Sequence, residues 1–273
     1  MSSAARPIGV FDSGMGGLTV MRALIERLPN ESFVYLGDTA RLPYGSKSPD
    51  TVTRYAVQCA SALGAYDIKL LVVACNTASS TALPALTAAL DPIPVIGVIE
   101  PGAEAAVAAA PQGRIAVIAT EGTVKGGAYA RAIHARNPGA RVVQQAAPLF
   151  VALAEEGLTE GPIAELVTRR YLEPVLAASR PEALVLGCTH FPALKSVIAD
   201  VAGPEIALVD SAATTAAAVE RLLAQRGLAR SGPHEAPRFL ATDAPERFAR
   251  VGEIFLGAAI PADAVEQIDL QKL

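Results

Sequence analysis

Tryptophan is absent from this chain of 273 residues, and aromatic residues make up only 5% of it. Hydrophobic residues nevertheless account for 51%, so the interior must consist mainly of alanine, valine, leucine and isoleucine. These residues are typical of parallel strands that helices cover on both faces. Because a chain of this length forms one large or two medium domains, we expect an α/β fold.

Cysteine is scarce, and the chain has only Cys59, Cys75 and Cys188. An odd and small set in a chain this long argues against a disulfide framework and favours a reducing cytoplasm. A strong charge of either sign is also lacking, because the net charge is −4. Nucleic acids and anionic membrane surfaces are therefore not expected partners.

Long apolar runs are missing as well. Polar residues, glycine or proline interrupt every candidate before it approaches the roughly 18 residues that a membrane helix requires. The first seven residues contain one arginine and lead into a short apolar segment at 8–11, which is too short for the apolar core of a signal peptide. We expect a soluble, cytoplasmic protein.

Two stretches of similar construction end an apolar run in a thiol. Residues 184–192 read LVLGCTHFP and contain Cys188, and residues 70–79 read LLVVACNTAS and contain Cys75. Short apolar runs are typical of buried parallel strands, and in open α/β sheets ligands bind beyond the carboxyl ends of such strands. A single buried cysteine is often only a small hydrophobic residue, but the repeated construction favours a site with two thiols.

Each thiol stretch is followed by another apolar run that ends in an acidic residue, PVIGVIEP at 94–101 and IALVDS at 206–211. We interpret this pattern as a diverged internal repeat. It predicts two pseudo-symmetric, doubly wound α/β lobes with mainly parallel sheets and an active site in the cleft between them. The two apolar runs have the form of crossovers between the lobes. The expected lobes are residues 1–98 plus 211–273, which carry Cys75, and residues 99–210, which carry Cys188.

The remaining apolar patterns predict further elements. Expected strands are residues 8–11, 32–36, 95–99, 114–119 and 142–146, with 239–243 as an edge strand. Expected helices are residues 51–63, 103–110, 162–179, 212–227 and 244–255. Cys59 lies within the first of these helices, where we expect it to contribute only packing.

A glycine-rich turn, DSGMGG at residues 12–17, follows the first expected strand. Its glycines do not have the spacing of the dinucleotide-binding motif. Asp12 at the strand end suits the orientation of a base or the binding of an ammonium group. A helix cap is the ordinary alternative for an aspartate at this place.

The segment GDTARLPYG at residues 37–45 has the composition of a functional loop. Tyr44 is expected to direct a hydroxyl, and Gly45 a backbone amide, toward a ligand. Asp38 and Arg41 are equally compatible with a surface ion pair that contributes little to stability.

Hydroxyl residues from Thr77 onward predict a helix start that favours negative charge, including a thiolate or a carboxylate ligand. In the other half of the chain, Glu155 is a candidate counterpart of an acid in the first lobe. An ordinary exposed glutamate near the helix stop at Gly157 is the simpler interpretation from the residues alone.

Two opposed thiols suit a specific reaction class. Racemisation of a carbon acid requires one group to remove a proton from one face and a second group to deliver a proton to the other. Ionising a thiol of ordinary pKa ~8.5 at pH 7 costs about 2 kcal/mol, which a helix N-terminus or a nearby histidine offsets.

Four motifs carry a family resemblance: FDSGMGGLTV at 11–20, GDTARLPYG at 37–45, ACNTAS at 74–79 and GCTHFP at 187–192. Together they resemble glutamate racemase, a cofactor-independent enzyme that supplies D-glutamate for bacterial peptidoglycan, and they span the chain in order. The resemblance implies two catalytic cysteines and three assisting residues, as well as a set of glutamate contacts. The implied catalytic residues are Cys75, Cys188, Asp12, His190 and Glu155. The implied substrate-binding residues are Asp12, Ser13, Asp38, Tyr44, Gly45, Asn76, Thr77, Thr189 and His190.

The resemblance implies no metal and no pyridoxal cofactor, and a homodimer is left open. The chain departs from the family pattern at four positions, where the family usually has serine, cysteine, proline and valine. These positions are Gly126, Ala147, Ala152 and Ala154. The departures bear most on the surroundings of Glu155.

Three alternatives remain open at this stage. A racemase of aspartate or a related acidic compound would use the same pair of thiols. Zinc could be bound by Cys75, Cys188, His190 and Asp12, although closely spaced cysteine pairs are absent. A ligand-binding or inhibitory protein without catalytic activity would explain the cleft but not the paired thiols.

Overall fold

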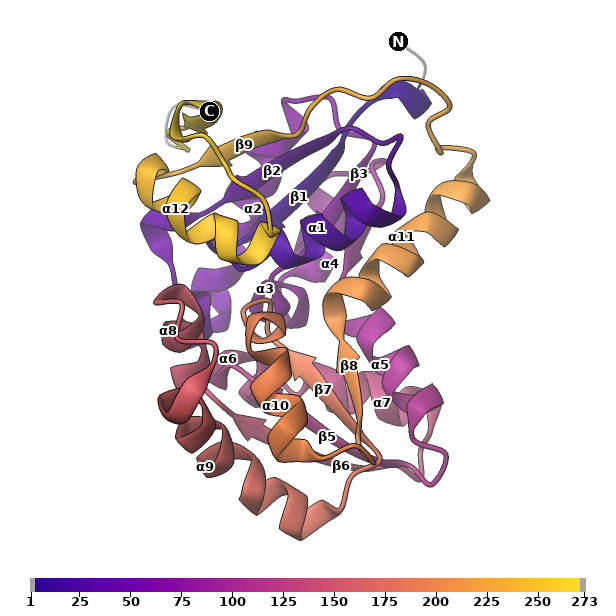
Figure 1. Cartoon of the computed structure of the whole chain (residues 1–273). Helices are drawn as coiled ribbons and strands as arrows, with labels where there is room; N and C mark the ends of the chain where they lie inside the picture. Colours follow the sequence, from indigo (N-terminus) through magenta and orange to yellow (C-terminus); the bar gives the residue numbers. More distant parts are fainter. Residues whose placement is uncertain (1–2, 271–273) are drawn as a thin grey trace.

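The computed structural model describes residues 3–270 and contains two parallel sheets (Figure 1). The larger sheet has the strand order β10–β9–β2–β1–β3–β4. Its strands are β1 (Ile8–Asp12), β2 (Phe33–Gly37), β3 (Leu70–Val73), β4 (Val95–Gly97), β9 (Arg238–Ala241) and β10 (Val265–Gln267). The smaller sheet has the order β6–β5–β7–β8. Its strands are β5 (Arg114–Ala119), β6 (Arg141–Ala146), β7 (Ala183–Gly187) and β8 (Ala207–Asp210).

Helices surround both sheets, and the chain alternates between strand and helix. The helices of the larger-sheet half are α1 (Leu18–Arg27), α2 (Pro49–Gly64), α3 (Asn76–Thr81), α4 (Leu83–Ala89), α11 (Ser211–Arg226) and α12 (Pro245–Leu256). Those that follow β4 and precede α11 are α5 (Ile99–Ala109), α6 (Glu121–Gly126), α7 (Ala128–Arg136), α8 (Leu149–Glu155), α9 (Gly161–Ser179) and α10 (Lys195–Ala202). Short 3-10 turns include η3 (Tyr44–Ser46) and η4 (Phe191–Leu194).

Burial explains why the central strands read as continuous apolar runs. Every residue of β1, β3 and β7 is buried, as expected for parallel strands that are covered on both faces. Every strand pair in both sheets is parallel. The predicted α/β fold, with two lobes built on mainly parallel sheets, is therefore confirmed.

The chain passes from one lobe to the other at the helices that follow β4 and β8. Helix α5 packs against α7, β7 and β8, whereas α11 packs mainly against α1 and also contacts α5. The first sheet consequently takes strands from both ends of the chain, and the second sheet takes strands only from its middle. In Figure 1 the upper lobe combines the indigo and yellow ends, and the lower lobe holds the magenta-to-orange middle.

The prediction of an edge strand at 239–243 was wrong. Strand β9 lies between β2 and β10, and β10 forms the edge. Strand β10 has only three residues, Val-Glu-Gln, and only its valine is buried. Because such a segment has no apolar pattern, a further strand beyond β9 could not be predicted from it.

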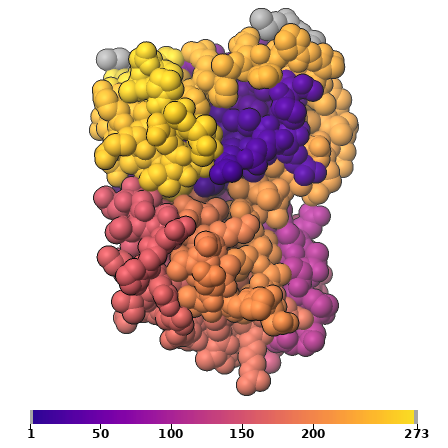
Figure 2. Space-filling model, in the orientation of Figure 1, coloured from indigo at the N-terminus to yellow at the C-terminus, as the bar shows by residue number. Residues whose placement is uncertain are grey.

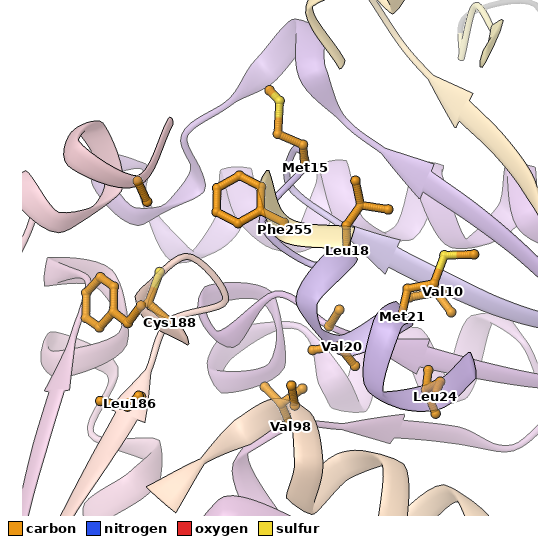
Figure 3. Packing of buried hydrophobic residues seen from close by; sticks show 14 of the residues in the cluster. Val10, Met15, Leu18, Val20, Met21, Leu24, Val98, Leu186, Cys188 and Phe255 are labelled. Carbon is orange, nitrogen blue, oxygen red and sulfur yellow. The ribbon is translucent and has the colours of Figure 1, made fainter. Parts of the chain in front are cut away.

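One apolar cluster joins the two lobes. It contains Leu18 of α1, Leu186 of β7 and Phe255 of α12, together with Cys188, and Figure 3 shows these residues around the end of α1. In the space-filling view the C-terminal residues rest directly on the segment around residue 150 of the other lobe (Figure 2). Among residues 3–270 no helix is both long enough and apolar enough to cross a membrane.

Candidate active site

The carboxyl ends of β3 and β7 present the two predicted thiols. Cys75 directly precedes α3 as its cap residue, and the Ala78 amide donates to its Sγ atom over 3.4 Å. Cys188 follows β7 at the corresponding place in the second sheet. The thiols are 5% and 6% exposed, and the turn after β1 lies against the surroundings of both, because Ser13 contacts Cys75 and Gly16 lies against His190, the neighbour of Cys188. The fold therefore brings the two sulfur atoms into one buried site from opposite lobes.

Cys75 shares its half of the site with the turn after β1. The Cys75 thiol donates to Oγ of Ser13 over 3.5 Å, and the fully buried Asp12 lies beside it. Burial, followed by the charge of Asp12, raises the pKa of Cys75 to about 12. This thiol is consequently protonated at neutral pH.

Asp12 has one satisfied oxygen atom and one free oxygen atom. Its Oδ2 accepts from the Gly14 amide over 3.0 Å, whereas Oδ1 is buried and has no partner within residues 3–270. Burial raises the pKa of this carboxyl above its ordinary value, although the charge of His190 opposes the shift. A buried acceptor without a donor costs free energy, so Oδ1 is a place where a ligand ammonium or hydroxyl group would be stabilised.

Cys188 shares its half of the site with an imidazole. Nδ1 of His190 lies 3.8 Å from Sγ of Cys188, and Nε2 lies 3.0 Å from Oε1 of Glu155. Burial alone would lower the pKa of His190, but the contacts with Cys188 and Glu155 outweigh it and raise the pKa to about 10. The imidazole is therefore held as a cation beside the second thiol.

Glu155 is not the ordinary surface glutamate that the residues alone suggested. Burial would raise its pKa, but the hydrogen bonds from His190 and from Nη2 of Arg247, the latter 2.8 Å long, outweigh burial and lower it. Sequence reasoning missed Arg247, which lies on α12, more than 90 residues from Glu155 along the chain. The sequence around Arg247 contains no motif that could have indicated this contact.

The lobes meet directly at the second half of the site. The Thr19 hydroxyl donates to the Thr189 carbonyl over 3.0 Å, and a Cβ atom on Gly16 would lie 2.3 Å from Nδ1 of His190. A side chain at residue 16 would therefore collide with the imidazole. The glycine-rich turn at residues 12–17 was the available signal for this close approach.

Asn76 and Thr77 lie at the start of α3, as predicted. Asn76 Nδ2 donates to the Tyr129 hydroxyl over 2.9 Å, whereas its buried Oδ1 has no partner within residues 3–270. Thr77 Oγ1 lies 3.0 Å from Oγ1 of Thr120 in the second lobe. Asn76 thus offers a second unpaired polar atom near the thiols, and Thr77 links the two lobes.

The loop at 37–45 differs from expectation. Asp38 and Arg41 form an ion pair with N···O 2.7 Å, but Asp38 is fully buried, so the pair is not a surface ion pair. The Tyr44 hydroxyl donates to Asp38, and Thr242 Oγ1 donates to the same carboxylate over 3.0 Å. Asp38 and Tyr44 therefore fix the shape of the loop.

Gly45 packs against the second lobe, where an added Cβ atom would lie 2.8 Å from Cβ of Thr120. Beside it, residues of both lobes surround a cavity of about 360 Å³ that extends to Glu155. Its lining residues are Leu42, Pro43, Gly45, Ser46, Thr120, Glu121, Pro148, Val151, Ala152 and Glu155. Of the four departures from the family pattern, only Ala152 lines this cavity, and Ala147 and Ala154 are buried.

Cys59, the third cysteine, is buried as expected. Nη2 of Arg41 contacts its sulfur atom over 3.5 Å, and burial raises its thiol pKa.

As for metals, residues 3–270 contain no group of three or more His, Cys, Asp or Glu side chains placed to hold a metal ion.

Comparisons with known proteins agree with this architecture. Residues 8–219 match the Asp/Glu/Hydantoin racemase family. A glutamate racemase from Geobacter metallireducens is 52% identical over 93% of this chain and 94% of its own length. A crystal structure of glutamate racemase from Francisella tularensis in complex with D-glutamate superposes with a TM-score of 0.91, at 38% identity over 99% of this chain and all of that chain.

A glutamate racemase from Thermus thermophilus, in complex with β-chloro-D-alanine, is 45% identical and has a TM-score of 0.88 over 99% of both chains. Allantoin racemase from Klebsiella pneumoniae shares the fold alone, at 20% identity and a TM-score of 0.55 over 83% of this chain and 90% of that chain. The matches to glutamate racemases extend over almost the whole chain and include both strands that end in a thiol. The chain therefore belongs to the Asp/Glu/hydantoin racemase family, within its glutamate racemase group.

Proposed function

We propose that this protein interconverts L- and D-glutamate by proton transfer at the α-carbon, with Cys75 and Cys188 as the two acid–base groups and without a cofactor. The observation that carries the proposal is the placement of two thiols from opposite lobes in one buried site. The glutamate racemases that match the chain, one of them with D-glutamate bound, support glutamate as the substrate.

In one direction, a thiolate at Cys188 removes the α-proton and Cys75 delivers its own proton to the opposite face. His190, whose Nδ1 lies 3.8 Å from the Cys188 sulfur, assists proton transfer at that thiol. The raised pKa of Cys75 keeps its proton in place for delivery. In the other direction the roles reverse, so each thiol serves one face of the planar intermediate. From the family resemblance we assign proton removal from L-glutamate to Cys188 and from D-glutamate to Cys75.

Substrate recognition uses the unpaired polar atoms of the site. Asp12 Oδ1 and Asn76 Oδ1 are buried acceptors that would accept from the substrate ammonium group. The amides and hydroxyls of Ser13, Thr77 and Thr189 supply donors for the carboxylates. Gly45 bounds the site from the loop, Asp38 and Tyr44 hold that loop, and Glu155 orients His190.

The lobes that carry the thiols comprise residues 1–98 plus 211–273 and residues 99–210 in this proposal. The enzyme works in the cytoplasm, either as one chain or as a homodimer, and supplies D-glutamate for peptidoglycan. Because each lobe brings one thiol, both must be in place for a full turnover.

The decisive experiment is proton exchange in deuterated water. Incubation with either enantiomer of glutamate should introduce deuterium at the α-carbon and bring the circular dichroism signal to zero. Aspartate, run in parallel, should change at least about tenfold more slowly. Racemisation of aspartate at an equal rate would mean that the substrate is the wider class of acidic amino acids.

A double variant, Cys75→Ala with Cys188→Ala, provides the control. Ligand binding that persists in this variant while exchange disappears is the expected result. If the native protein binds glutamate but exchanges no α-proton, it is a binding protein and the racemase proposal is wrong.

A further inference from the structure

Helix α12 reaches across to the second half of the site through a chain of polar contacts. Nη2 of Arg247 donates to Oε2 of Glu155 over 2.8 Å. The other oxygen of Glu155 lies 3.0 Å from Nε2 of His190, and Nδ1 of that ring lies 3.8 Å from the Cys188 sulfur. An arginine of the larger-sheet half is thus three contacts away from a thiol of the other lobe.

The same helix contacts the imidazole a second time. The ring of Phe255 packs edge-on against His190, with centroids 5.0 Å apart and an interplanar angle of 73°. Helix α12 itself packs against α1, β10 and α8, so its position is fixed from both lobes. Figure 3 shows Phe255 and Cys188 in the same apolar cluster, the first from α12 and the second from the end of β7.

We propose that Arg247 is a positioning residue for the Cys188 half of the site. It holds the Glu155 carboxylate in the orientation in which Oε1 meets Nε2 of His190, and thereby aims Nδ1 at the Cys188 sulfur. Phe255 restricts the tilt of the same ring. This inference rests on the proposed two-thiol racemisation, and it makes the C-terminal helix part of the catalytic apparatus of the opposite lobe.

The charges that face His190 determine the sign of the effect. Cys188, Glu155 and Asp12 favour its cationic form, and Arg247 supports the ionised form of Glu155. Loss of Arg247 removes a nearby positive charge, which by itself would raise the pKa of His190. A fall in the pKa of His190 therefore requires that Glu155, whose own pKa should rise, lose the orientation in which it meets the imidazole. Arg247 has a side chain that is 39% exposed, so solvent screens part of this effect.

The first test is independent of activity. The chain has only three histidines, so carbon-13 NMR of histidine-labelled protein can follow each imidazole. In Arg247→Gln the titration midpoint of His190 should fall by about half to one pH unit. Arg247→Lys should restore most of the shift, and Arg250→Gln, which removes the same charge from an exposed position on the same helix, should leave the midpoint unchanged.

The second test separates the two halves of the site. Enantiomers have equal free energy in water, so kcat/KM for racemisation is equal in both directions in every variant and cannot reveal a one-sided defect. A glutamate with chloride at the β-carbon can: removal of the α-proton expels chloride, and the resulting enamine hydrolyses to 2-oxoglutarate and ammonium. One base is sufficient for this elimination, so each enantiomer reports one thiol.

Arg247→Gln should slow elimination from the L-analogue about tenfold and leave elimination from the D-analogue unchanged. Equal slowing of both enantiomers, or a response identical to that of Arg250→Gln in both tests, would overturn the positioning role. If the native enzyme neither racemises glutamate nor eliminates chloride, the proposed function fails, whereas the NMR midpoint still decides whether Arg247 controls His190.

Discussion

The two halves of the site share a backbone plan but not their chemical neighbours. In both, a buried parallel strand ends in a cysteine. Around Cys75 the contacts are made within one lobe, by the Ser13 hydroxyl and the Ala78 amide. Around Cys188 the direct contact is His190, two residues along the chain, and this imidazole is held by Glu155 and, through it, by Arg247 of the other lobe.

This difference shows how a symmetric task is performed by an asymmetric site. In the proposed mechanism each thiol both accepts and donates a proton, yet burial and the charge of Asp12 raise the pKa of Cys75 to about 12, and the cationic His190 lies beside Cys188. The two directions of the proposed reaction therefore start from unequal surroundings.

Removing either thiol should have the largest effect on the reaction. Cys75→Ser or Cys188→Ser should reduce racemisation by roughly 10³-fold or more, because a serine hydroxyl is far too weak an acid to serve as the base. Circular dichroism of reactions started from L- or D-glutamate measures this loss of racemisation rate. Elimination from the β-chloro analogue should survive for one enantiomer in each variant, with Cys75 acting on the D-form and Cys188 on the L-form.

Loss of elimination from the same enantiomer in both variants would contradict the assignment of one thiol to each face. Racemisation that persists in either variant would contradict the two-base mechanism itself. Cys59→Ser is the matched control, since this third cysteine is buried beside Arg41 and should leave both reactions unchanged.

A smaller effect should follow from removing the assistant of each thiol. His190→Asn should slow elimination from the L-analogue about 10²-fold, and Asp12→Asn should do so for the D-analogue, in line with ordinary acid–base contributions. Release of 2-oxoglutarate from each enantiomer measures the two halves separately. Equal slowing of both enantiomers by either variant would show that its residue serves the whole site.

Sequence patterns predicted the features that depend on local structure. Apolar runs identified the strands, and polar residues placed directly after them identified Cys75, Cys188 and the turn at Asp12. This was possible because strand burial fixes both the apolar pattern and the point at which a side chain can reach a ligand.

Features that depend on contacts between distant segments were not predictable. Arg247 lies in an ordinary amphipathic helix, and only the packing of α12 against α8 brings it to Glu155. The burial of Asp38 was hidden for the same reason, because Thr242, some 200 residues away, closes over it. Strand β10 was not predicted because a three-residue edge strand carries no periodic signal.

The contact between the halves can be tested at Gly16. A methyl group there would lie 2.3 Å from Nδ1 of His190, so Gly16→Ala should destabilise the fold by about 1–3 kcal/mol through overpacking and displace the imidazole. Gly14→Ala is the matched control, because its nearest neighbour, Cδ2 of Leu42, would lie 3.5 Å away. Urea denaturation of both variants measures the free energy of unfolding. Equal losses in the two variants would contradict a clash that is specific to residue 16.

The smallest expected effect concerns the charge of Asp12 on Cys75. With Cys59 and Cys188 replaced by alanine, Cys75 is the only thiol, and its reaction with iodoacetamide measures its thiolate fraction. Because its pKa is raised to about 12, the rate should rise about tenfold per pH unit through pH 10 in the folded protein. In the unfolded protein the rate should level off once the pH exceeds the ordinary thiol pKa of about 8.5.

Adding Asp12→Asn should accelerate this reaction at pH 8 by a few fold, up to about tenfold. The reason is that Asp12 contributes to the raised pKa of Cys75, although burial contributes more. The same substitution is expected to slow elimination from the D-analogue, and the opposite signs have a physical origin. Alkylation depends only on how much thiolate is present, whereas the proposed catalysis also needs Asp12 as an assisting residue, whose carboxylate would take up the thiol proton when substrate binds. A slower alkylation in the Asp12→Asn variant, with its fold intact, would show that Asp12 acts on Cys75 by orientation and not by charge.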